Sequence, residues 1–148
     1  MIKKKILSIF VFLFLTSCGF TPIYLNNNTN FSIEEVDFTG DRQLNNFLKI
    51  NLNRFKNKES NNKINIKVRS EYEKIILSKD STGEASNYQI EAKVIFFISQ
   101  SNTKIQITEK KIMESMSDKF EEVKYEKSIK QNFADSITNK LALELSKN

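Results

Sequence analysis

The one cysteine of the chain, Cys18, is the residue with the most recognisable chemistry. It ends the tetrad Leu15-Thr16-Ser17-Cys18. This tetrad fits the bacterial lipobox, in which the thiol receives a diacylglyceryl group before the chain is cleaved ahead of the cysteine. The small side chain of Ser17 directly before the cysteine suits such processing. The sequence therefore predicts that Cys18 becomes the lipidated first residue of the mature protein.

The segment before the cysteine has the layout of a secretory signal. Lys3, Lys4 and Lys5 form a cationic start, and residues 6–15 form an apolar run. A membrane-spanning helix needs about 20 apolar residues, so this shorter run is not a permanent anchor by itself. Acyl chains on Cys18 would anchor the protein stably, at ~0.8 kcal/mol per buried methylene. The alternative is an ordinary signal peptide followed by an incidental cysteine.

Composition excludes several kinds of catalytic site. The chain has no histidine and a single cysteine, so the usual nitrogen and thiolate metal sites and any histidine-based triad are excluded. Its three glycines are too widely spaced for a phosphate-binding loop. The adjacent carboxylates Glu34-Glu35 and Glu121-Glu122 are interpreted as solvated surface. We expect no catalytic residue, no metal and no cofactor, and therefore a protein that is not an enzyme.

The charge of the mature chain is nearly balanced. The full 148 residues hold 23 Lys and Arg and 18 Asp and Glu, a net charge of +5. Removing residues 1–17 from 148 leaves 131 residues and takes away three of the 23 cations, so 20 cations face 18 acids and the net charge is +2. This balance gives no indication of a nucleic-acid partner.

The chain divides into three parts. Residues 1–17 are expected to be the signal peptide. Residues 18–30, which end in the polar tract Asn26–Asn30, are expected to be the lipidated N-terminus and a flexible tether. Residues 31–148 carry the amphipathic patterning and have the length of a single domain.

Hydrophobic periodicity predicts two helices in this domain. After Gly40-Asp41, apolar residues recur at spacings of three and four to about Lys56, with Asp41 as the N-cap. A longer helix follows Ser117-Asp118, with Asp118 as its cap. Its apolar stripe repeats every fourth residue at Ile129, Phe133, Ile137, Leu141 and Leu145.

Alternation of apolar and polar residues predicts four strands. They cover residues 31–38, 64–77, 88–98 and 105–113. An irregularity is expected at Glu34-Glu35 in the first, and a turn over residues 78–87 joins the second to the third. The order strand, helix, three strands, helix predicts an α+β fold, a four-stranded, mostly antiparallel sheet with two helices packed on one face.

The residues that follow the lipobox carry a family resemblance. Residues 18–24, Cys-Gly-Phe-Thr-Pro-Ile-Tyr, resemble the Cys-Gly-Phe-x-Pro-Leu-Tyr opening of alphaproteobacterial members of the lipopolysaccharide-assembly lipoprotein family, LptE. The match covers about seven residues, and Leu25 stands where that pattern has glycine. The predicted order of strands and helices agrees with the fold of that family.

This resemblance implies a small lipidated subunit of the outer-membrane translocon that delivers lipopolysaccharide to the cell surface. In that family the subunit plugs LptD, a large β-barrel, and assists its assembly. The implied partners are LptD, lipopolysaccharide and the membrane that holds the N-terminal lipid. The implied location is the periplasmic side of the outer membrane.

The sheet face turned away from the helices is where we expect a partner or phosphorylated sugars to bind. Lys67 and Arg69 alternate with apolar residues of the second strand, and Lys93 has the same polar parity on the third. Cations bind phosphate groups, and arginine can do so bidentately. The alternative for all three is solvated surface charge, because carboxylates such as Glu71 are close in sequence.

Ile95 and Phe97 make the end of the third strand apolar on both faces. Strands of this kind are usually covered on both faces. Either a loop or the second helix covers these residues within the monomer, or Phe97 belongs to a surface that contacts a partner or lipopolysaccharide.

Two other functions remain open. A lipid-anchored periplasmic carrier or chaperone, not tied to a barrel, would have a deep apolar pocket. An enzyme would require an acid–base pair at useful spacing, and the sequence shows no such pair.

Overall fold

A computed structural model describes residues 31–56 and 60–147 of the chain. Cys18, the expected signal peptide and the expected tether lie outside the described residues. The elements are β1 (Ser32–Gly40), α2 (Arg42–Leu52), the short 3₁₀ turn η1 (Asn53–Phe55), β2 (Lys63–Lys79), β3 (Ala85–Ile98), β4 (Thr103–Glu114) and α3 (Lys119–Leu145). The predicted order of strands and helices is confirmed.

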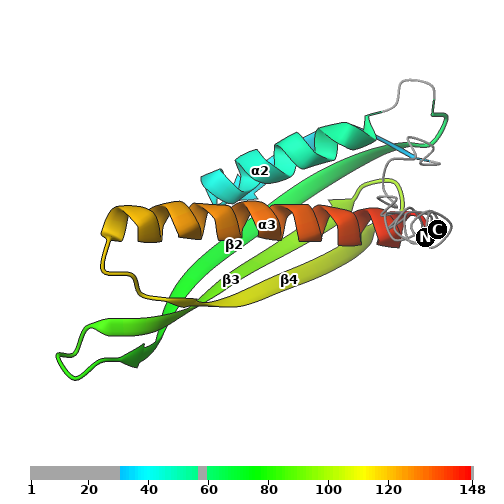
Figure 1. The fold of residues 1–148 in the computed structure, drawn as a ribbon. Helices are drawn as coiled ribbons and strands as arrows, with labels where there is room; N and C mark the ends of the chain where they lie inside the picture. The colour runs from blue at the N-terminus through cyan, green and yellow to red at the C-terminus, as the bar shows by residue number, and fades with distance from the viewer. Residues whose placement is uncertain (1–30, 57–59, 148) are drawn as a thin grey trace, which may run out of the picture.

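The described residues form two layers, a sheet and a pair of helices (Figure 1). The strands lie in the order β1-β2-β3-β4, with β1 parallel to β2 and the other neighbours antiparallel. Helices α2 and α3 lie side by side and cover one face of the sheet (Figure 1). The α+β fold with a mostly antiparallel sheet is thus confirmed. The β2–β3 hairpin extends past the N-terminal end of α3 (Figure 1).

Both predicted helix caps are present. The Asp41 carboxylate accepts a hydrogen bond of 2.7 Å from the N–H of Leu44. The Asp118 carboxylate accepts one of 2.8 Å from the N–H of Phe120 and a second from Glu121. Each cap satisfies N–H groups that a helix leaves unpaired at its start, and so fixes where the helix begins.

The core lies between the two layers. The predicted stripe of α3 is buried along its whole length, and Ile129, Ile137 and Leu141 have no exposed surface. On the sheet, the facing residues include Val68 and Phe96, which are cross-strand partners and both buried. Burying a side chain of this size contributes roughly 1.5–3 kcal/mol, so this layer contact holds the sheet and the helices together.

Three local features differ from or refine the sequence prediction. The irregularity at Glu34-Glu35 is a shift in the β1–β2 register between Ile33 and Glu35. Strands β2 and β3 both extend further towards the turn that joins them than expected, so the turn consists only of residues 80–84. Asp80 makes this short turn possible, because its carboxylate accepts hydrogen bonds from the N–H groups of Thr82 and Glu84.

None of the helices in the described part of the chain is both long enough and apolar enough to cross a membrane.

Candidate functional site

The sheet surface opposite the helices, here called the open face, brings the predicted contact residues together. The strand register places Lys67 beside Phe97, Arg69 beside Ile95, and Glu71 beside Lys93. Strand β4 continues these three rows with Lys104, Gln106 and Thr108. The residues between them in sequence, such as Val68 and Phe96, face the buried core. All four predicted residues, Lys67, Arg69, Lys93 and Phe97, therefore belong to one surface.

Glu71 forms ion pairs with two of the three predicted cationic residues. Lys93 Nζ lies 2.7 Å from Glu71 Oε2, and Arg69 Nε lies 3.4 Å from Glu71 Oε1. The hydrogen bond from Lys93, with its charge, lowers the pKa of Glu71, so this carboxylate stays ionised at neutral pH. The cluster of Arg69, Glu71 and Lys93 thus carries one net positive charge.

Phe97 lies between two lysines that lack such a carboxylate. Lys104 Nζ is 5.9 Å from the centre of the Phe97 ring, and Lys67 is the cross-strand partner of Phe97 on the other side. Among the described residues neither lysine makes an ion pair. This end of the open face offers an aromatic ring flanked by cations, which suits a phosphorylated sugar or an acidic protein surface.

Two apolar residues of the open face, Phe97 and Ile95, have different environments; nearer the hairpin the same face also carries Ile75 and Ile112. Phe97 is 41% exposed, whereas Ile95 is only 9% exposed. Helix α3 packs on the opposite face, so the second helix does not cover Phe97. Ile95 lies between its cross-strand neighbours Arg69 and Gln106, and its buried side chain contributes to the packing of the sheet. Of the pair, Phe97 is the residue available to a partner.

Glu122 was predicted to be solvated, and this prediction is wrong because only 5% of the residue is exposed. Its carboxylate accepts hydrogen bonds from the N–H of Met116 at 2.9 Å and from Lys119 at 3.0 Å. Lys74 on β2 donates a third, at 3.1 Å, and the Ser115 hydroxyl a fourth, at 3.2 Å. The backbone N–H of Met116, aided by the two lysines and opposed by burial, lowers the pKa of Glu122 to about 2.

The same network continues along the inner side of α3. Lys74 Nζ lies 3.0 Å from Glu126, and the Tyr72 hydroxyl donates a hydrogen bond of 2.7 Å to the same carboxylate. Burial, together with Glu126, raises the pKa of Tyr72 above its usual value. Lys130 Nζ is 3.7 Å from the centre of the Tyr72 ring and 3.8 Å from Asp41.

This network joins β2, α3 and the cap of α2, and we interpret it as structural because each carboxylate in it already has a cationic or hydrogen-bonding partner. A signal for it existed in the sequence. Glu122, Glu126 and Lys130 are spaced by four, and this spacing places them on one helix face close to Ile129 and Phe133. Within residues 31–56 and 60–147, no group of carboxylates is arranged to hold a metal ion.

Solved structures resemble this fold. Rare lipoprotein B from Shewanella oneidensis superimposes with a TM-score of 0.51 at 14% sequence identity, covering 75% of this chain and 96% of that one. The chain has the fold of a bacterial lipoprotein. The solution structure of an uncharacterised lipoprotein B from Nitrosomonas europaea gives a TM-score of 0.52 at 16% identity and covers 79% of this chain and 88% of that one.

Sequence comparison adds nothing to this likeness, since neither the known protein families nor the curated proteins give a match. At 14% and 16% identity these two likenesses show the fold alone.

Proposed function

We propose that this protein is a lipid-anchored subunit of the outer-membrane lipopolysaccharide translocon. It plugs and assists the assembly of the LptD β-barrel and helps to deliver lipopolysaccharide to the outer leaflet. It works by binding and by steric fit and makes or breaks no bond, so it is not an enzyme. The protein is located on the periplasmic side of the outer membrane, to which acyl chains on Cys18 anchor it.

Three lines of support are independent of one another. The lipobox at Cys18 and the LptE-like residues 18–24 come from the sequence. The fold is one that two solved bacterial lipoproteins share. The observation that carries the proposal is the open face, on which Lys67, Arg69, Lys93 and Phe97 meet.

The open face has the chemistry that either partner requires. Phosphate groups on a lipid sugar bind to cations, and Lys67 and Lys104 are exposed beside the Phe97 ring. A barrel wall would bury the same ring, because a partly exposed aromatic side chain is a common anchor of an interface. Both uses leave the helix layer and the core unchanged.

The test is depletion of the protein in its own cells, with newly made lipopolysaccharide at the cell surface as the measurement. Depletion should stop its appearance at the surface and lower the amount of folded LptD. Complementation with the unchanged gene should restore both, and Phe97→Asp should fail to do so although the variant still folds. The matched control Leu143→Asp, on an α3 residue that is 46% exposed, should restore both.

Normal surface lipopolysaccharide after depletion would refute the translocon function and would favour the carrier. Folding of the Phe97→Asp variant is checked by its circular dichroism and its thermal unfolding. Loss of cooperative unfolding in that variant would show instead that Phe97 belongs to the core.

A further inference from the structure

The outer surface of the helix layer is a second distinctive surface, and the proposed function does not use it. It lies on α2 and on the N-terminal part of α3, opposite the open face. We call it the cationic helix face and define it by the exposed residues Arg42, Gln43, Lys49, Ile50, Phe120, Val123, Lys124 and Lys127.

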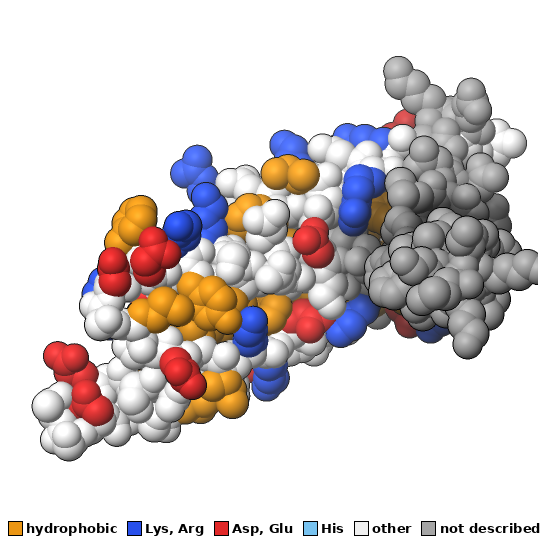
Figure 2. All heavy atoms as spheres, in the orientation of Figure 1, with side chains coloured by type: hydrophobic (Ala, Val, Ile, Leu, Met, Phe, Trp, Pro, Cys, Tyr) orange, Lys and Arg blue, Asp and Glu red, His pale blue; other side chains and the backbone are white. Residues whose placement is uncertain are grey.

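The first half of this surface is uniformly positive. Its charged residues on α2 are Arg42 and Lys49, and residues 42–56 as a whole, which also hold the exposed Arg54 and Lys56 beyond this face, contain no Asp or Glu. Among the described residues none of the four makes an ion pair. On the open face, by contrast, Glu71 neutralises part of the positive charge. Figure 2 shows basic side chains along α2.

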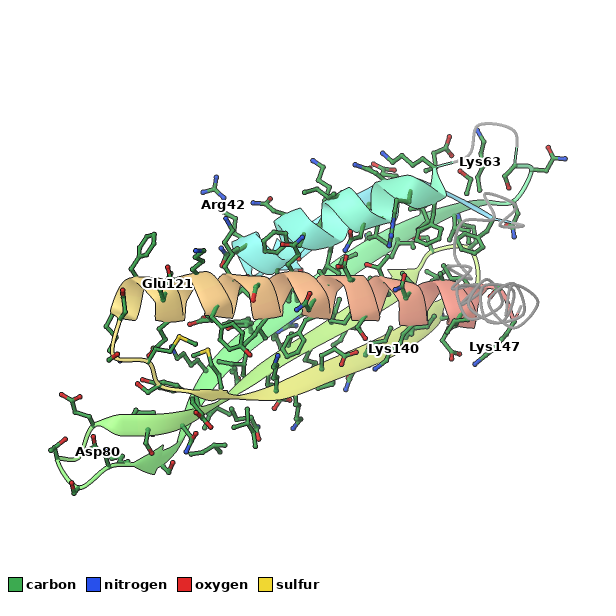
Figure 3. All side chains as sticks on the ribbon, viewed as in Figure 1. Arg42, Lys63, Asp80, Glu121, Lys140 and Lys147 are labelled. Carbon is green, nitrogen blue, oxygen red and sulfur yellow. The ribbon has the colours of Figure 1, made fainter. Side chains whose placement is uncertain are left out.

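The second half is positive because α3 turns most of its nearby carboxylates inward. Glu122 and Glu126 both bind Lys74 of β2, at 3.1 and 3.0 Å. Lys124 and Lys127 remain exposed on the outer side, and Glu121 lies 3.4 Å from Lys124. The labelled residues Arg42 and Glu121 lie at the same end of the helix layer, and the Arg42 side chain points away from the sheet (Figure 3).

Large apolar side chains stand among these cations. Phe120 is 74% exposed, and Val123 and Ile50 are each 66% exposed. Phe120 and Val123 are three residues apart on α3 and therefore neighbours on its surface. With Gln43, Lys124, Lys127 and Glu126, whose carboxylate is paired with Lys74, they line a groove of about 460 Å³ between the N-terminal ends of α2 and α3.

We propose that the cationic helix face docks on an anionic lipid bilayer, with Phe120, Val123 and Ile50 inserted between the headgroups. A bilayer leaflet presents anionic groups over an area as broad as this surface, with an apolar phase directly beneath them. Exposed lysines and arginines around a few large apolar residues are the pattern of helices that lie in this interface. Charge complementarity and the exposed apolar groups both favour lipid as the occupant.

The length of chain before β1 permits this orientation. The 13 residues 18–30 can reach at most about 45 Å when extended, and the 27 residues of α3 span about 40 Å. Strand β1 begins at the end of the domain where α3 finishes (Figure 1). A lipid on Cys18 therefore allows the domain to lie with α2 and α3 on the bilayer. This docked state belongs to the lipid-anchored protein before it enters a barrel, because a plug inside a barrel is enclosed by the barrel wall and no longer lies on the bilayer.

This inference shares with the proposed function the lipidation of Cys18, but it does not require a barrel. The test uses the lipidated full-length mature protein in vesicles of phosphatidylcholine, with or without about 30% phosphatidylglycerol. Because the chain has one cysteine, which carries the lipid, an introduced cysteine is the only free thiol. A nitroxide label is placed at Gln43→Cys in the groove, or at Gln106→Cys on the open face as the matched control.

The expected result is that the label at position 43 becomes accessible to oxygen and protected from a water-soluble nickel complex in the anionic vesicles alone. The label at position 106 should stay in water in both kinds of vesicle. About 1 M salt should return the first label to water, because the screening length falls to about 3 Å. The triple variant Arg42→Gln, Lys49→Gln, Lys127→Gln should lower the docked-to-free ratio on the order of 100-fold.

A second triple variant, Lys67→Gln, Arg69→Gln, Lys104→Gln, removes the same charge from the open face and should leave docking unchanged. A label at position 43 that stays in water on anionic vesicles would overturn the inference. Burial of that label only when a barrel protein is added, whatever the lipid charge, would also overturn it and would identify a protein as the occupant. Neither result would affect co-purification with LptD, so failure here is distinct from failure of the proposed function.

Discussion

At the scale of single residues, the buried carboxylate of Glu122 links the stability of the domain to pH. Its pKa is lowered from the usual 4.5 to about 2 in the folded protein. The ionised form is therefore favoured by folding, and the stabilisation is fully present above pH 4.5. It is lost as the pH falls through that range towards about 2.

We predict that Glu122→Gln lowers the free energy of unfolding at pH 7 by roughly 2–3 kcal/mol, because the amide cannot replace a carboxylate bound by two lysines. The variant should also lose part of the acid dependence seen in the unmodified protein between pH 4.5 and about 2. Urea unfolding over a pH series measures both effects. Glu121→Gln, at an exposed neighbour, should change neither, and equal effects of the two substitutions would contradict the account.

The residues of the open face could be predicted from the sequence, because the position of a residue in the alternating pattern of a strand determines the face of the sheet on which it lies. Lys67, Arg69, Lys93 and Phe97 share one side once the strands are in register. The sequence does not reveal that Glu71 bridges two of these cations, because that contact depends on which residue of β2 lies opposite Lys93. Glu122 was assigned wrongly because a pair of adjacent acids gives no indication of Lys74, 48 residues away.

At the scale of elements, Gly40 determines how β1 leads into α2. Its φ of +100° lies in the region that side chains rarely adopt, and a Cβ at this position would overlap the carbonyl oxygen of Ser70 on β2. The next residue, Asp41, donates its N–H to the same oxygen at 3.2 Å and then caps the helix. The end of the strand, the turn and the cap therefore depend on the absence of a side chain at Gly40.

We predict that Gly40→Ala destabilises the domain by more than 2 kcal/mol, because it adds a backbone clash to the conformational strain. Gly83→Ala is the matched control. Gly83 also has a positive φ, +87°, but a Cβ there meets nothing within 4 Å, so the cost should be near 1 kcal/mol. Thermal unfolding of both variants makes the comparison, and equal losses would show that the Ser70 contact is unimportant.

Element order could be predicted because the local signals agree with the final packing. The stripe on α3 and its Asp118 cap are local patterns, and the structure confirms both. The length of the β2–β3 hairpin is less evident from local sequence patterns. Ile75, Ile76 and Leu77 interrupt the apolar–polar alternation, and the paired strands nonetheless continue to Lys79. Cross-strand hydrogen bonds, which no sequence pattern shows, extend the hairpin.

At the scale of the whole molecule, the two layers separate two kinds of surface. The sheet presents an open face on which cations flank Phe97, and the helices present a face whose exposed charge is mostly positive around Phe120 and Val123. The core between them occupies the inner side of both layers. The two proposals of barrel binding and lipid docking therefore concern different surfaces of one fold and can be tested separately.

The central claim, a subunit bound to a large β-barrel, is tested most directly by its composition in the membrane. The lipidated protein, tagged at its C-terminus, is extracted from its own outer membrane in mild detergent, and the proteins that co-purify are quantified. The account predicts a single large β-barrel in a one-to-one ratio that survives a salt wash. Recovery of the lipoprotein alone, with the barrel present in the same membranes, would contradict it.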